Sequence, residues 1–150
     1  MKRKIGRNGS NKHLHDIKKP RIFFAHHYSD EGSLTLMKNQ RRSGHLNFVD
    51  YSIPSSKKYD LFWKTGAKYR IKTVDAVAVL IGNSKLSNSI LWEMKVAKKY
   101  SKPIIAIEIK REITKPQYIK NQKIKSVKWN CKKVQNEFDK TFKYRSKKHD

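Results

Sequence analysis

The strongest constraint on the fold of this chain is the segment 74–82, which is almost wholly apolar and rich in β-branched residues. Such a run is typical of a strand that is covered on both faces, as strands of parallel sheets are. Residues 21–25 and 104–109 have the same character. Residues 45–51 are predicted to form a further strand, and residues 125–130 a last strand at the sheet edge.

The segments between these strands carry apolar residues at helical spacing. Helices are predicted over 33–42, 59–73 and 87–101, and residues 110–125 are expected to be irregular. A final helix is indicated by Val134, Phe138 and Phe142, which recur every four residues on one stripe. Alternating strands and helices predict an α/β fold, a parallel sheet with helices on both faces.

In such folds, ligands bind beyond the carboxyl ends of the strands. This rule points to the loops after Ala25, Tyr51 and Gly82.

The charge of the chain is strongly positive. It has 36 Lys and Arg against 12 Asp and Glu, a formal net charge of +24. Residues 1–20 contribute +6, residues 110–150 contribute +10 and the apolar middle contributes +8. The excess indicates nucleic acid or another polyanion as a partner, or simply a basic surface that maintains solubility. We expect a flexible basic arm over 1–19, one domain over 20–142 and a basic tail over 143–150.

Several classes of protein are excluded by composition. No apolar stretch approaches the roughly 20 residues of a membrane span, and the basic start lacks the apolar stretch of a signal peptide. The single cysteine, Cys131, excludes an internal disulfide framework and a cysteine-rich zinc site, and it lacks a recognisable nucleophile context. We therefore expect a cytoplasmic protein with no membrane partner and no metal.

Glu93 is the most informative single residue. In a helix over 87–101 it falls between Ala97 and Tyr100, within or beside the apolar arc. The solvent side is taken by Lys95, Lys98 and Lys99. A carboxylate on the apolar side costs desolvation free energy unless it has a partner or a use. It is either a catalytic acid, base or sugar-hydroxyl ligand, or an acid stabilised by the helix dipole.

Other polar residues follow the predicted strands. His26 and His27 suggest a ligand-facing loop, since no third metal ligand is obvious. Asp50 and Tyr51 suit hydroxyl or base contacts, or are a turn-capping acid and a packed ring. The small polar residues before and at the start of the helix over 87–101 suit a phosphate or ribose: Asn83, Ser84, Ser87, Asn88 and Ser89. Dinucleotide, P-loop and nucleophile-elbow motifs are not found.

Five segments together resemble the TIR-like family typified by the ThsB subunit of Thoeris antiphage defence. No single motif is decisive, but their order and spacing over about residues 20–109 are fairly specific; they are RIFFAHHYSD (21–30), NFVDYSIP (47–54), AVLIG (78–82), SNSILWEM (87–94) and PIIAI (103–107). The resemblance implies a flavodoxin-like sheet of about five strands in the order 2-1-3-4-5. It also implies NAD+ as a substrate rather than a cofactor and cleavage of the nicotinamide–ribose bond. The implied product is an ADP-ribose-derived signal, in cyclic form, that a partner effector senses, and the implied alternative to a partner effector is self-association of the protein.

The resemblance also assigns the site. Glu93 takes the position of the catalytic glutamate, and Ser89 stands where many relatives carry Trp. The implied substrate-binding residues come from the loops after the first three strands and from the following helix: Phe24, Ala25, His26, His27, Tyr28, Asp30, Asp50, Tyr51, Ser52, Asn83, Ser84, Ser89 and Trp92. The loop to Ser56 is expected to be a mobile wall of the site.

Two other functions stay open at this point. One is a non-catalytic TIR-like interaction module that assembles with partner domains. The other is a nucleic-acid-binding protein that uses this fold and binds through its basic tails, with an affinity that falls steeply with salt.

Overall fold

The computed structural model describes residues 19–27, 30–53, 62–82, 85–110 and 112–149. Its centre is a single sheet of five parallel strands in the order β2-β1-β3-β4-β5. The strands are β1 (Arg21–Ala25), β2 (Val49–Asp50), β3 (Ala76–Ile81), β4 (Ile104–Glu108) and β5 (Lys125–Lys128). The predicted α/β class and the implied strand order are both confirmed.

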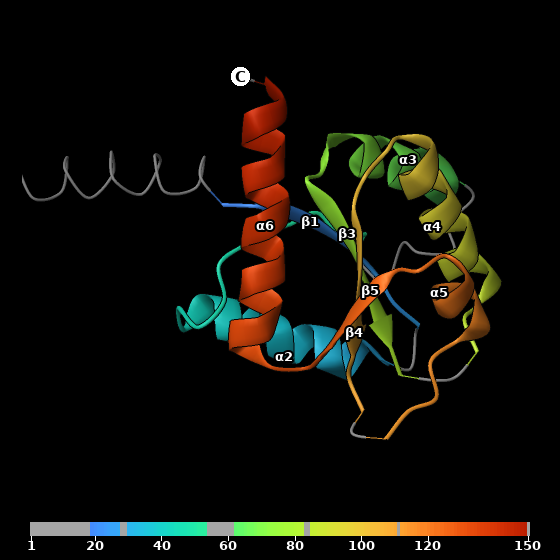
Figure 1. Ribbon diagram of the computed structural model, residues 1–150, viewed down its shortest axis with the longest axis horizontal. Helices are drawn as coiled ribbons and strands as arrows, with labels where there is room; N and C mark the ends of the chain where they lie inside the picture. Colours follow the sequence, from blue (N-terminus) through green and yellow to red (C-terminus); the bar gives the residue numbers. More distant parts are fainter. Residues whose placement is uncertain (1–18, 28–29, 54–61, 83–84, 111, 150) are drawn as a thin grey trace, which may run out of the picture.

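Helices cover both faces of the sheet (Figure 1). They are α2 (Glu31–Arg42), α3 (Trp63–Thr73), α4 (Asn88–Lys99), α5 (Gln117–Asn121) and α6 (Cys131–His149). Helices α3, α4 and α5 lie on one face, and α2 and α6 lie on the other. Among the described residues, no helix is both long enough and apolar enough to cross a membrane.

Side chains alternate along the strands and so build two separate cores. In β1, Phe23 packs into the core under α3 and α4, and the next residue, Phe24, packs into the core under α2 and α6. Phe24 meets Phe48 and Phe138 edge to face, with ring centroids 5.3 and 6.3 Å away. Strand β3 is buried along its whole length, since its neighbours β1 and β4 pair with it on both sides.

The predicted strand over 45–51 is reduced to Val49–Asp50 in β2. The reason is a side chain: Gln135 on α6 accepts a hydrogen bond from the Asn47 N–H at 2.5 Å and donates one to the Asn47 carbonyl at 3.2 Å. The amide of Gln135 thus takes the place that a neighbouring strand would have. Leu46 and Phe48 are nevertheless buried in the core, as an apolar segment should be.

The segment 110–125 was expected to be irregular, which is wrong at its centre. Helix α5 lies there, with Pro116 at its start and Ile119 buried against the core. A helix of one turn with one fully buried side chain leaves too little periodicity to detect. Helix α6 continues to His149, through the position at which we expected the domain to end. The expected arm, apart from Lys19, lies outside the described residues.

Candidate functional site

The candidate site lies at the carboxyl edge of the sheet, where β1 leads to His26, β2 to Tyr51 and β3 to Gly82. Because the strands are parallel, these three loops emerge at one edge. Helix α4 begins at the same edge, one loop after β3, and packs on β1 and β3. The topology therefore gathers the segments that the sequence singled out.

Glu93 is buried in the second turn of α4, with 2% of its surface exposed. The helix is capped by Ser87, whose hydroxyl oxygen accepts a hydrogen bond from the Ile90 N–H at 3.3 Å. Its apolar side, with Ile90 and Met94, faces the core, and Glu93 lies on that side. The exposed side carries Lys95, Lys98 and Lys99. The helical periodicity predicted this burial; the catalytic role of Glu93 stays a prediction.

Asp30 connects the loop after β1 to the end of β3. It is 5% exposed, and its backbone N–H donates to the His27 carbonyl at 2.9 Å. Both carboxylate oxygens lie so close to Gly82 that a Cβ at that position would collide with them. The observed position of the Asp30 carboxylate is therefore compatible only with a residue that has no Cβ at position 82.

The loop after β2 is held by polar contacts. Asp50 accepts a hydrogen bond from the Ser52 N–H at 2.9 Å, and its other oxygen lies 3.1 Å from the Lys38 ammonium. Burial opposes ionisation, but the hydrogen bonds from Ser52 and the charge of Lys38 outweigh it and lower the pKa of Asp50. Of the two interpretations left open for Asp50, this geometry matches the turn cap.

Two further contacts fix this loop against its neighbours. The Phe24 N–H donates to the Ser52 hydroxyl at 3.2 Å, so two predicted site residues meet. Arg70 on α3 donates to the carbonyls of Tyr51 and Ser52 at 3.2 and 2.9 Å. Sequence reasoning missed Arg70, because a cation near a helix end gives no sign of the loop that it reaches.

The two histidines differ in burial. His26 is 2% exposed, and its Nδ1 lies 3.5 Å from the Phe24 carbonyl, whereas His27 is half-buried. In the part of the chain that the structure describes, no three His, Cys, Asp or Glu side chains are grouped to hold a metal. The predicted residues Tyr28, Asn83 and Ser84, and the loop 54–61, lie outside the described residues.

A cavity of about 370 Å³ lies between α3 and the start of α4. Its walls are two tryptophans, one lysine and three small polar residues: Trp63, Lys64, Ser87, Asn88, Ser89 and Trp92. The rings of Trp63 and Trp92 meet edge to face, with centroids 5.3 Å apart. The Lys64 ammonium lies 5.4 Å from the centre of the Trp92 ring and 6.0 Å from that of Trp63.

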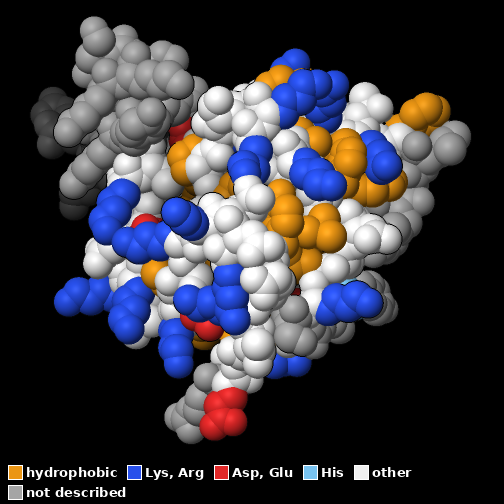
Figure 2. Space-filling view, turned by 45° about the vertical axis from the view of Figure 1, so that its right-hand side comes forward, with side chains coloured by type: hydrophobic (Ala, Val, Ile, Leu, Met, Phe, Trp, Pro, Cys, Tyr) orange, Lys and Arg blue, Asp and Glu red, His pale blue; other side chains and the backbone are white. Residues whose placement is uncertain are grey.

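The cavity brings together four residues that the sequence singled out with two that it did not indicate, Trp63 and Lys64; the four are Ser87, Asn88, Ser89 and Trp92. On the side of the molecule that carries α3, α4 and α5, exposed hydrophobic side chains lie among Lys and Arg side chains (Figure 2). The sequence signal available for Trp63 and Lys64 was an aromatic residue followed by a cation, within the predicted helix over 59–73.

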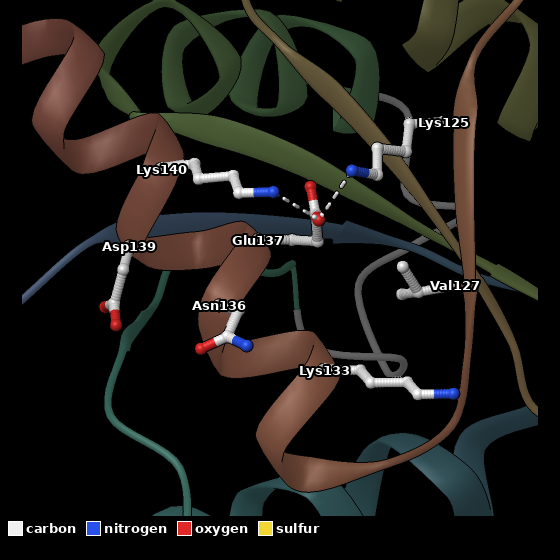
Figure 3. A pocket seen from close by; sticks show the side chains of 7 residues that line it. All are labelled: Lys125, Val127, Lys133, Asn136, Glu137, Asp139 and Lys140. Atoms are coloured by element: carbon white, nitrogen blue, oxygen red, sulfur yellow. Dashed lines mark hydrogen bonds and ion pairs between the residues drawn. The ribbon is translucent and has the colours of Figure 1, made fainter.

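A second cavity, of about 400 Å³, lies between β5 and α6, and no predicted site residue lines it (Figure 3). Glu137 is at its centre, 3.0 Å from the Lys125 ammonium and 3.3 Å from that of Lys140. Hydrogen bonding and attraction to Glu137 raise the pKa of Lys125. Asp139 points away from this group.

A five-stranded parallel sheet in the order 2-1-3-4-5, helices on both faces and polar loops at the carboxyl edge define a flavodoxin-like α/β domain. Residues 23–114 match the family model described as Thoeris protein ThsB, TIR-like domain. The chain belongs to this family, as the sequence resemblance predicted.

Comparisons with individual proteins add the following. The structure of Clostridium botulinum CMP N-glycosidase, BcmB, is similar with a TM-score of 0.48 and 14% sequence identity, over 79% of this chain and 98% of that chain. Among curated protein sequences, none matches this chain significantly.

Proposed function

We propose that this chain is an enzyme that breaks the glycosidic bond between nicotinamide and ribose in NAD+, with Glu93 as its catalytic carboxylate. The observation that carries the proposal is a carboxylate 2% exposed on the core side of α4, in a member of the ThsB TIR-like family. Acidic side chains buried near the edge where α/β folds bind ligands are candidates for catalytic groups, because active sites are where such carboxylates gather.

The chemistry suits one carboxylate. Nicotinamide carries a positive charge in NAD+ and leaves as a neutral ring when the bond to C1′ breaks, so strong general acid catalysis is unnecessary. The transition state has oxocarbenium character at the ribose. A fixed negative charge that holds the ribose hydroxyls would stabilise this developing positive charge.

The acceptor of the ADP-ribosyl group is water or an atom within the same molecule. Water gives ADP-ribose, and internal attack gives a cyclic product. Within the proposal, the product is a signal for a partner effector in antiphage immunity, and the enzyme acts alone or after self-association.

The test is nicotinamide release from NAD+, measured by chromatography with mass spectrometry, with and without lysate from phage-infected cells. The expected result is nicotinamide together with a product of ADP-ribose composition or of that composition less one water. Glu93→Gln should lower the rate by about a hundredfold or more, because the electrostatic stabilisation is lost.

A matched control is Glu108→Gln, which changes another buried glutamate, at the end of β4. It should keep the wild-type rate. Thermal unfolding by circular dichroism checks that both variants fold. Wild-type turnover by a folded Glu93→Gln variant, or no nicotinamide release under either condition, would contradict the proposal.

A second candidate function is binding of nucleic acid, and one observation favours it. Lysines are concentrated on α5, β5 and α6, within the folded domain and around the cavity of Figure 3. Among the described side chains of residues 117–141, the exposed lysines are Lys120, Lys123, Lys125, Lys128, Lys132, Lys133 and Lys140. Glu137, the acid at the centre of the cavity, is already paired with two of them.

A further inference from the structure

The cavity between α3 and α4 has walls that differ in kind from the surroundings of Glu93. We infer that this cavity holds the adenine base of the substrate, with the attached phosphates toward Lys64, while the nicotinamide ribose is turned to Glu93. The inference rests on the proposed function, and it names the part of the dinucleotide that the cavity takes.

The aromatic walls suit a flat ring. Trp63 and Trp92 come from two different helices, and both line the cavity. Bases of any identity stack on indole rings, because every base has a π-face. The volume of about 370 Å³ is near the lower end of the range of about 300–1,000 Å³ for small-molecule sites. It therefore suits part of a dinucleotide rather than the whole.

The charge in the cavity selects between the two rings of NAD+. The Lys64 ammonium lies within about 6 Å of both indole centroids, in cation–π geometry. None of the described residues that line the cavity is acidic. The cationic nicotinamide ring would meet a like charge there, whereas adenine is neutral and its phosphates are anionic. Lys64 thus favours the adenine end.

The polar wall adds hydrogen-bonding groups beside the rings. The hydroxyls of Ser87 and Ser89 lie 3.1 Å apart, and the side chain of Asn88 supplies both a donor and an acceptor. Ser89 also precedes Glu93 by four residues, so the two lie on neighbouring positions of the same helix side. One wall residue of the cavity is therefore about one helical turn from the proposed catalytic carboxylate along α4.

The test is calorimetric titration of the full chain with AMP and with nicotinamide mononucleotide. AMP should bind, and nicotinamide mononucleotide at equal concentration should not displace it. Trp63→Ala should weaken AMP binding by about fivefold or more, since one stacking wall is removed. Lys64→Gln should weaken AMP binding and reduce its dependence on salt.

Two substitutions on the exposed side of α3 serve as matched controls. Tyr69→Ala removes another aromatic ring and Lys68→Gln another lysine, both outside the cavity. Both should leave the affinity for AMP unchanged. If Trp63→Ala proves unfolded by circular dichroism, Lys64→Gln carries the test alone. Unchanged AMP affinity in the cavity variants, no AMP binding, or displacement by nicotinamide mononucleotide would overturn the inference.

Failure of this inference is distinguishable from failure of the proposed function. AMP binding that depends on Trp63, without any cleavage of NAD+, would contradict the proposed reaction alone. Cleavage that depends on Glu93, with AMP affinity indifferent to Trp63 and Lys64, would contradict the adenine assignment alone. If both hold, Trp63→Ala should raise the KM for NAD+ more than it lowers kcat, because stacking of a remote base is kept in the transition state.

Discussion

Gly82 and Asp30 show how a single side-chain position can fix two loops of the site. The Asp30 carboxylate lies against the backbone of Gly82, at the end of the most deeply buried strand. The loop after β1 is therefore joined to the loop after β3 by direct contact. A Cβ at position 82 would force the Asp30 carboxylate to move away.

Gly82→Ala should destabilise the protein by about 1–3 kcal/mol, because the added methyl group overpacks a filled space. Urea unfolding followed by circular dichroism measures the change. Gly66→Ala is the matched control, since a Cβ there meets nothing within 4 Å and the residue lies inside α3. The free energy of unfolding of this second variant should rise by about 0.5–1 kcal/mol, because Ala favours the helix more than Gly does. Equal effects of the two substitutions would contradict the packing argument.

Asp50 makes the stability depend on pH in a defined direction. Its pKa is lowered from the ordinary value of 3.8 in the folded state, so its ionised form favours folding. This contribution is fully present above about pH 3.8 and is lost as the pH falls through the lower folded value. The free energy of unfolding of wild type minus that of Asp50→Asn should therefore shrink below pH 3.8. A difference that stays constant with pH would disprove the assignment.

The sequence indicated some site residues and not others for a physical reason. Glu93 could be found because an acid among Ile90, Met94 and Ala97 breaks an amphipathic pattern that one helix displays by itself. Trp63, Lys64 and Arg70 act across elements. Their roles depend on how α3 is placed against α4 and against the loop after β2, which no local periodicity encodes.

At the scale of elements, the edge strand β2 depends on a helix from the far end of the chain. Strand β2 has only two residues, which pair with Arg21 and Ile22 of β1. The Gln135 amide continues its hydrogen bonding at Asn47. The backbone hydrogen bonds at this edge of the sheet are therefore made partly by β1 and partly by the Gln135 side chain.

Gln135→Ala should cost about 1–3 kcal/mol, since two hydrogen bonds to the backbone are lost at about 0.5–1.5 kcal/mol each. Amide exchange at Asn47 should accelerate, because its N–H loses its acceptor. Hydrogen exchange measured by NMR or mass spectrometry gives the exchange rate at Asn47, and the slowest-exchanging amides give the free energy of unfolding. Asn136→Ala, at the adjacent exposed position, should leave exchange at Asn47 unchanged. If the exchange rate at Asn47 is the same with and without the Gln135 amide, the two hydrogen bonds between these residues (the Gln135–Asn47 clamp) do not protect this edge.

The elements themselves were predictable to different degrees. Strands β3 and β4 and helix α4 are long, regular and uninterrupted in pattern, and the sequence placed them within a few residues. The length of strand β2 was overestimated. Leu46 and Phe48 are apolar because they pack in the core, although they do not belong to the strand. Helix α5 was missed, because a single turn has no period.

At the scale of the whole molecule, part of the positive charge belongs to the folded domain. Residues 110–150 carry a net charge of +10, and this segment forms α5, β5 and α6 rather than a separate tail. Removing this segment would take Val134 and Phe138 from the core, so a truncation would lose both charge and stability. Substitution of exposed lysines removes the charge and leaves the core intact.

The triple variant Lys128→Gln, Lys132→Gln and Lys133→Gln tests the second candidate function. If nucleic acid binds at β5 and α6, the salt dependence of binding should fall by about 0.7–0.9 in log–log slope for each lost phosphate contact. The matched control removes the same charge from the other face, at Lys95, Lys98 and Lys99. Fluorescence anisotropy with a labelled oligonucleotide measures both. Equal slopes for the two variants would indicate that nucleic acid responds to the overall charge and does not bind specifically at β5 and α6.

The clamp between Gln135 and Asn47 also sets the order in which the domain can be completed. The two residues are 88 positions apart, and α6 supplies Phe138 to the ring cluster with Phe24 and Phe48. A nascent chain that has already made β1, β2 and α2 still lacks the helix that covers their face and holds their edge. The contacts that complete β1, β2 and α2 therefore become available only after the chain has been synthesised as far as Phe138.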